Sequence, residues 1–284
     1  MTYMTELKKQ ISASLRKDLE AGELILPSLP EVAMTIQEEV KKKSSTAHSV
    51  AKVIMLDPGL TAHFLKVANS PLYRTKNAVK GLPEAIGLIG INSVLNMALT
   101  YTMRTMFVNT EGPWKKVLIQ QWNEATELAA IVTVLADYIP NFDSDHVMVA
   151  AMLQNIGVLP LINHLQHFPD LEEEDVEHLV EENATKAGLA LVKLWGLGQS
   201  FGDVIKARRN WNFESTESLD TTDLITIARY HYMKGKKRLS ECPPPSEISA
   251  FRHLEKLNFS ADMSEQWIDS AREKIRAIKR MLSM

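Results

Sequence analysis

Apolar residues recur at helical spacing along most of the chain. Over Leu7–Leu19 they follow one another every four positions, which places them on one face of an amphipathic helix that Gly22 ends. Further helices are predicted to start at Pro30 and at Pro58, because proline suits the first helical turn and Asp57 can cap the second of these helices. No run of alternating apolar and polar residues indicates a β-sheet. The pattern therefore predicts an all-α fold.

Three more helices are predicted in the middle of the chain. Leu82–Ile89 and Ser93–Phe107 have helical apolar faces and are separated by Gly90, a typical helix terminator. The turn-rich run Asn109–Pro113 follows, and after it comes a long helix over Trp114–Tyr138. We therefore expect two packed helical subdomains, an N-terminal one over residues 1–110 and a C-terminal one over residues 111–284.

The most apolar window of the chain is Val147–Ile162. It is interrupted by Gln154, Asn155 and Pro160, and it is shorter than the roughly 20 residues that a membrane-spanning helix needs. The N-terminus lacks the apolar stretch of a secretion signal. These features predict a buried helix in a cytoplasmic protein that has no membrane partner.

The last part of the chain is expected to form a terminal amphipathic helix. Pro243–Pro245 is predicted to be a stiff spacer before it. Its apolar stripe either packs on the core, which we favour, or forms the contact of a homodimer. The stripe consists of Trp267, Ile268, Ala271, Ile275, Ile278 and Leu282.

Composition narrows the classes of partner and compartment that the chain could have. The chain has 284 residues, of which 45% are hydrophobic, so it can bury a sizeable core. Thirty-two Lys and Arg against 35 Asp and Glu give a formal net charge of −3, so no basic field indicates a nucleic-acid partner. The single cysteine, Cys242, excludes an internal disulfide and favours a reducing compartment.

An ordered set of motifs resembles a known bacterial signalling family. Leu26–Val32 reads Leu-Pro-Ser-Leu-Pro-Glu-Val, Asp57–Thr61 reads Asp-Pro-Gly-Leu-Thr, and Val67–Ser70 reads Val-Ala-Asn-Ser with Tyr73 after it. Together with Trp195-Gly196-Leu197 they resemble the HDOD domain, the HD-related output domain, over roughly residues 20–235. The resemblance implies two packed helical subdomains, the second similar to the HD-superfamily metal phosphohydrolases.

In the enzymes of that superfamily, imidazoles and carboxylates hold a divalent metal that activates water against a phosphate ester. The resemblance implies that this chain has lost them, since amides bind divalent metals weakly and guanidiniums do not bind them. It therefore implies neither a metal or other cofactor nor a catalytic residue, and we expect no enzyme activity. The residues at the matching positions are Glu124, two places after the helix residue Trp122, then Gln154-Asn155, Ala184, Arg208-Arg209 and Arg229.

The arginines among these residues suggest an alternative role. Arg208, Arg209 and Arg229 could hold an anion, such as a phosphate, a nucleotide or a partner's carboxylate, by bidentate hydrogen bonds in the relic pocket. The interpretation that we favour is structural: two of the three point to solvent and one pairs with Glu124.

A pair of histidines is a further candidate for a metal. His164 and His167 are three residues apart and could bind a transition metal from one helix face, but no third ligand is positioned by the sequence. We favour a helix C-terminal turn in which the imidazoles meet free backbone carbonyls. We therefore predict no metal site here.

Three classes of function remain. The favoured class is a non-catalytic regulatory module of signal transduction that acts through contacts with other signalling proteins. The second is a sensor that binds a nucleotide or another anion in the relic pocket. The third is a metal-dependent phosphohydrolase, which we rank last because the sequence shows no set of convergent ligands.

Overall fold

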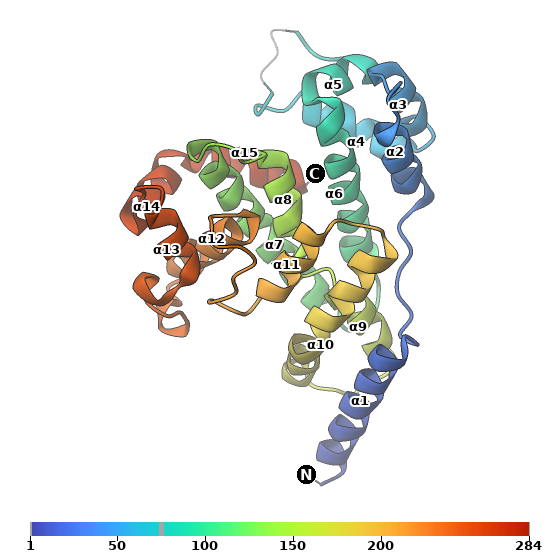
Figure 1. The fold of residues 1–284 in the computed structure, drawn as a ribbon. Helices are drawn as coiled ribbons and strands as arrows, with labels where there is room; N and C mark the ends of the chain where they lie inside the picture. The colour runs from blue at the N-terminus through green and yellow to red at the C-terminus, as the bar shows by residue number, and fades with distance from the viewer. Residues whose placement is uncertain (1, 74–76, 284) are drawn as a thin grey trace.

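The computed structural model describes residues 2–73 and 77–283, with side chains from residue 9 onward; the side chain of Leu7, which the predicted stripe of the first helix includes, lies outside these residues. Within this part of the chain every regular element is a helix, as Figure 1 shows, so the all-α prediction is confirmed. The first six helices are α1 (Thr2–Ala21), α2 (Glu31–Lys41), α3 (Ala47–Ile54), α4 (Pro58–Ala68), α5 (Leu82–Ile89) and α6 (Ile91–Asn109).

The residues of the N-terminal motifs form caps and turns between these helices. Asp57 accepts a hydrogen bond from the backbone N–H of Leu60 at 2.9 Å, as expected for an N-cap. Asn69, at the end of α4, donates to the carbonyl of Leu65 and forms hydrogen bonds with both backbone groups of Val79 at 2.8 Å. Gly90 has φ = 93° between α5 and α6, and the two helices meet at 104° there. These motif residues therefore determine how the helices are connected.

The second half of the chain is built around α7, which packs against α8, α12 and α15. Its central position follows from its composition, since buried residues cover more than one face of the helix. The elements are α7 (Lys115–Tyr138), α8 (Ser144–Leu153), α9 (Val158–Leu165), α10 (Glu173–Leu194), α11 (Gln199–Ala207), α12 (Thr221–Gly235), the 3₁₀ turns Leu239–Glu241 and Pro245–Glu247, α13 (Ser249–Glu255), α14 (Ala261–Ser270) and α15 (Arg272–Ser283).

The first and last helices each pack against helices from the other half of the chain. Helix α1 packs against α10, and an extended segment then runs along the molecule to α2 (Figure 1). The indole N–H of Trp195 donates to the carbonyl of Pro27 at 2.9 Å, so the two motifs that are furthest apart in the sequence are in contact. Helix α15 packs on α6 as well as on α7. The division at residue 110 stays a prediction.

The apolar window in the middle of the chain is buried. Ser144–Leu165 is long and apolar enough to cross a membrane by composition, and 89% of its most apolar part lies inside the protein. The predicted burial is confirmed, but the prediction of a single helix is wrong. The segment consists of two helices, α8 and α9, because the chain turns at residues 154–157.

The C-terminal region differs from the prediction of a single terminal helix. Three helices, α13 to α15, follow the prolines, because Ser260 caps a new helix and α14 ends at Ala271. The apolar stripe is therefore divided between α14 and α15. Ile278 and Leu282 are buried in the core, which agrees with the packing role that we favoured.

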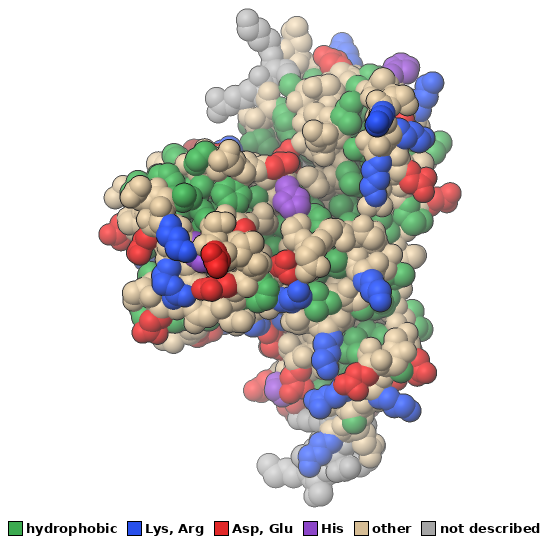
Figure 2. Space-filling model, in the orientation of Figure 1, with side chains coloured by type: hydrophobic (Ala, Val, Ile, Leu, Met, Phe, Trp, Pro, Cys, Tyr) green, Lys and Arg blue, Asp and Glu red, His purple; other side chains and the backbone are tan. Residues whose placement is uncertain are grey.

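Charged groups of both signs are interspersed over the surface. On the face that Figure 2 shows, Lys and Arg lie among Asp and Glu side chains and hydrophobic ones, without a continuous basic field. This distribution agrees with the low net charge of the chain.

Candidate functional site

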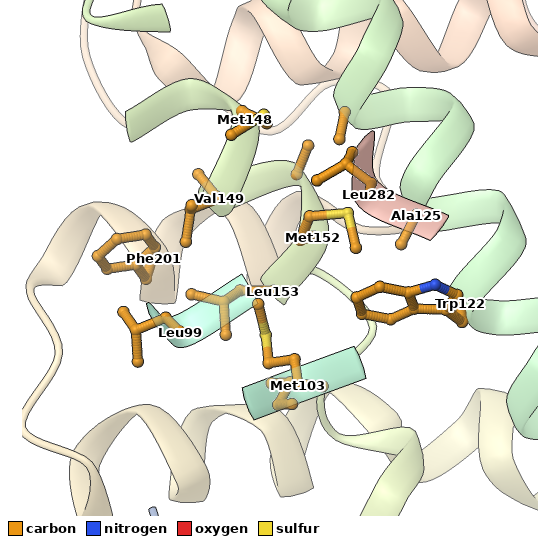
Figure 3. Packing of buried hydrophobic residues seen from close by; sticks show 14 of the residues in the cluster. Leu99, Met103, Trp122, Ala125, Met148, Val149, Met152, Leu153, Phe201 and Leu282 are labelled. Atoms are coloured by element: carbon orange, nitrogen blue, oxygen red, sulfur yellow. The ribbon is translucent and has the colours of Figure 1, made fainter. Parts of the chain in front are cut away.

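Helix α7 contributes Trp122 to the hydrophobic core and Glu124 to the surface. The Trp122 ring is 4% exposed and lies 5.8 Å from the ring of Phe107, measured between centroids. Figure 3 shows it beside Met152 and Ala125, among residues of α6, α7 and α8. Glu124 lines an open groove. The two neighbouring candidates thus have different surroundings, and Trp122 is a core residue.

Gln154 and Asn155 lie at the turn between α8 and α9, where both are buried. The Gln154 side-chain amide donates to the carbonyl of Ala151 at 3.0 Å. The Asn155 side-chain oxygen accepts a hydrogen bond of 2.8 Å from Nε of Arg208. Asn155 therefore connects the turn after α8 to the end of α11, whereas the hydrogen bond of Gln154 stays within the end of α8.

Arg208 is the centre of a hydrogen-bonded ion-pair network. Its Nη1 and Nη2 atoms each lie 3.1 Å from one carboxylate oxygen of Glu181 on α10, a bidentate arrangement. Glu181 also forms an ion pair with Arg209, whose Nε lies 2.7 Å from Oε1. Burial lowers the pKa of Arg208, and the Glu181 charge opposes that shift. The Asn155–Arg208–Glu181–Arg209 network connects three helical elements, α8, α10 and α11.

Arg229 comes from α12 and caps the C-terminus of α11. Its Nη1 donates to the carbonyl of Ala207 at 2.9 Å and to that of Arg208, both at the end of that helix. Its guanidinium carbon lies 4.0 Å from the ring centroid of Trp211, a cation–π contact. Burial lowers the Arg229 pKa to about 10, so the group stays charged at neutral pH. The negative end of the α11 dipole and the indole ring favour that charge.

The turn between α8 and α9 lies directly on α10. A Cβ atom built on Gly157 would come within 2.0 Å of the carbonyl oxygen of Ala184 and 2.5 Å of the backbone nitrogen of Gly188. Ala184, which the resemblance places at a histidine position, is itself 2% exposed. The close backbone approach brings Asn155 and Glu181 to the same side of the molecule.

An open groove of about 760 Å³ between α7, α10 and α12 adjoins this network. Its cations are already paired: Arg209 with Glu181, Lys236 with Glu127 at 3.1 Å, and Arg238 with a carboxylate outside the groove. Carboxylates outnumber cations along its walls, which disfavours an anionic ligand in the groove. The charged lining residues are Glu124, Glu127, Glu174, Glu177, Glu181, Arg209, Lys236 and Arg238.

The family model for the HDOD domain matches residues 26–211. The chain belongs to the HDOD family. No curated protein matches the sequence. The match ends at Trp211, so α12 to α15 lie beyond the HDOD model.

Solved structures share the fold of this HDOD chain. A candidate metal-dependent phosphohydrolase from Shewanella amazonensis SB2B superposes with a TM-score of 0.80 at 23% identity, over 97% of this chain and 99% of that one. An HDOD domain protein of unknown function from Geobacter sulfurreducens gives 0.71 at 19% identity, over 95% and 97% of the two chains. A candidate signal transduction protein from Marinobacter aquaeolei VT8 gives 0.64 at 19% identity, over 96% and 66%.

The arginines of this HDOD chain are arranged differently from our structural interpretation. Two of them, Arg208 and Arg229, are buried, and the ion pairs of Arg208 and Arg209 go to Glu181. The predicted solvent exposure of two arginines and the pairing with Glu124 are therefore wrong. Glu181 was missed because it belongs to an acidic run that indicates a solvated helix face. Its position three residues before Ala184, on the same side of α10, is the signal that could have identified it.

The groups at the expected ligand positions do not fit a divalent metal. Two amides, three guanidiniums, one alanine and the single carboxylate of Glu124 offer no set of anionic or imidazole donors. Over residues 2–73 and 77–283, no group of three His, Cys, Asp or Glu residues could hold a metal ion. His167 Nδ1 lies 2.9 Å from the carbonyl oxygen of His164, which agrees with the C-terminal turn that we favoured for these histidines.

Glu181→Gln is expected to destabilise the protein by about 1–3 kcal/mol, because it leaves the buried Arg208 guanidinium without its carboxylate. Urea denaturation at neutral pH measures the change. Glu177→Gln is the matched control, one helical turn earlier on α10 and in the wall of the same groove; its effect should stay within about 0.5 kcal/mol. Equal effects of the two substitutions would show that the Arg208 pair adds no stability.

Proposed function

We propose that this HDOD chain is a non-catalytic regulatory module of signal transduction that acts through contacts with other signalling proteins in the bacterial cytoplasm. The proposal rests on the bidentate Arg208–Glu181 ion pair, in which the remaining nitrogen of Arg208, Nε, donates to Asn155. In this arrangement a guanidinium connects α8, α10 and α11, at residues where the HD enzymes would use metal ligands. A fixed positive group of this kind can stabilise the fold but cannot activate water.

The related structures support a regulatory role only through their names. One is named as a candidate signal transduction protein, and another as a candidate metal-dependent phosphohydrolase. The proposal takes the first role for this chain, because the side chains at the expected ligand positions are amides and guanidiniums. Contacts with partner proteins would then carry the signal.

Metal content and hydrolysis test the proposal together. The purified protein is analysed for bound metals, and turnover of a phosphomonoester and a phosphodiester is measured with added manganese. We expect less than one tenth of an equivalent of metal after dialysis, and the same background rate for the wild type and for Asn155→Ala. A stoichiometric metal that survives dialysis, with turnover that Asn155→Ala abolishes, would overturn the non-catalytic assignment.

A further inference from the structure

The guanidinium of Arg229 has two donors without a partner. The residue is 7% exposed, and its Nε and Nη2 atoms are buried with no hydrogen-bond acceptor among the residues that the structure describes. Its third nitrogen, Nη1, is the one that donates to the end of α11. Leaving a buried charged donor unpaired costs about 1–3 kcal/mol or more. Buried charges of this kind are normally paired, so an acceptor is expected.

The positions of the two free donors indicate what that acceptor is. Nε and Nη2 lie on the same edge of the planar guanidinium, the side-on edge that binds two oxygens of a carboxylate or phosphate group in parallel. The chemistry of this edge therefore fits an oxyanion.

The local charge balance supports the same conclusion. Arg208, Arg209 and Arg229 are three neighbouring cations, and one carboxylate, Glu181, forms ion pairs with the first two of them. Three positive charges and one negative charge leave a formal surplus of two. Glu124 acts on Arg208 and Arg229 only through longer-range Coulomb attraction. A small anion would reduce this surplus inside the protein.

The surroundings of Arg229 supply further polar groups and a cover. Arg229 shares a narrow space between α8, α11 and α12 with the side chains of Gln154, Thr222 and Thr226. As the side chains stand, this space does not admit a water molecule. The partly exposed Trp211 lies against the guanidinium, in the loop between α11 and α12. The indole therefore covers one face of the guanidinium.

We propose that Arg229 is the anchor of a small-oxyanion site beneath Trp211, in which a phosphate or carboxylate group binds Nε and Nη2 when the indole and the side chains around that edge move apart. The site differs from the adjoining groove, whose walls are acidic. It extends the proposed function by giving the regulatory module a ligand, and it requires no catalysis. Displacement of Trp211 would change the surface of the α11–α12 loop when the anion binds.

The site is tested by urea denaturation of the protein in inorganic phosphate. The reference is the same measurement in sodium chloride at equal ionic strength. At ten times the dissociation constant, phosphate should lower the unfolding equilibrium constant about 11-fold. Arg229→Met should abolish this effect. Arg229→Lys keeps the charge but not the side-on edge, so it should also abolish it, and it serves if the methionine variant does not fold. Arg252→Met, a change of a half-exposed arginine on α13 that pairs with Glu214 and lies outside the three-arginine cluster, should retain the phosphate effect.

Tryptophan fluorescence gives a second readout, because phosphate should change the emission of the wild type and not that of Trp211→Phe. Acetate in place of phosphate distinguishes a carboxylate ligand from a phosphate. The site is refuted by the absence of stabilisation by either anion, by an effect that persists in both Arg229 variants, or by an effect that Arg252→Met removes. Phosphate binding without turnover leaves the proposed function intact, whereas metal-dependent turnover would overturn that function and not this site.

Discussion

Gly157→Ala is expected to destabilise the protein by about 4 kcal/mol or more, a large value for one methyl group. The added Cβ would lie 2.0 Å from the carbonyl oxygen of Ala184 and 2.5 Å from the nitrogen of Gly188, and both are backbone atoms of α10. Rotation of a side chain cannot relieve this contact. The φ angle of Gly157 is −64°, which any residue adopts, so the effect would come from space alone. Urea denaturation, or failure to obtain folded protein, measures it.

The matched control is Gly87→Ala in α5. A Cβ at Gly87 meets no atom within 4 Å, so the substitution should stabilise the protein by about 0.5–1 kcal/mol. A cost below about 1 kcal/mol for Gly157→Ala would mean that the turn between α8 and α9 does not rest on α10. The arrangement of Asn155 against Arg208 would then need revision as well.

The helices could be predicted well where apolar periodicity and turn residues agree. Leu82–Ile89 has the predicted limits, and α7 begins one residue after the predicted Trp114. The prediction failed after Pro245, where one stripe of apolar residues belongs to two helices. Trp267 and Ile278 are in register on an ideal helix, and a break at Ala271 is not visible in hydrophobicity. The break depends on tertiary packing against α7.

The sequence predicted several residues of the candidate site, but it did not predict which of them are in contact. Motif spacing gave Asn155 and Arg208, which are 53 residues apart and hydrogen-bonded. The partner Glu181 could not be distinguished from its acidic neighbours, because charge composition does not show which carboxylate faces the protein interior. Trp211 was missed for a similar reason, since an aromatic residue in a loop gives no periodic signal. Burial and orientation are properties of the fold.

Under the proposed function, the network takes the place of a metal centre in connecting the helices. A metal centre would connect several helices through its ligands. Here Arg208 connects α8, α10 and α11, and Arg229 connects α12 to the end of α11. Guanidiniums can replace the connecting role of a metal because they carry charge and several donors in one plane. They do not supply a metal's activation of water, which is why the proposed function is regulatory and not hydrolytic.

Acid is expected to destabilise the protein through two buried histidines. Burial lowers the pKa of both His63 and His231 from 6.5 to about 4. The ring of His63 lies 5.1 Å from that of Tyr101, and His231 Nε2 forms a hydrogen bond of 2.8 Å with Ser264. As the pH falls below 6.5 the unfolded chain binds protons at these residues, and the folded protein does not until about pH 4. Stability is therefore full above pH 6.5 and is lost as the pH falls toward 4.

The expected loss is about 2 kcal/mol for each histidine between pH 7 and pH 5, or about 4 kcal/mol for the two. Urea denaturation over this range measures it. His63→Gln and His231→Gln should each reduce the change in the free energy of unfolding with pH by about half, even if they lower stability at pH 7. His48→Gln changes an exposed histidine and should leave the slope unchanged. A slope that neither buried-site variant alters would place the acid sensitivity in the carboxylates instead, and the two imidazoles would then be accessible to protons in the folded state.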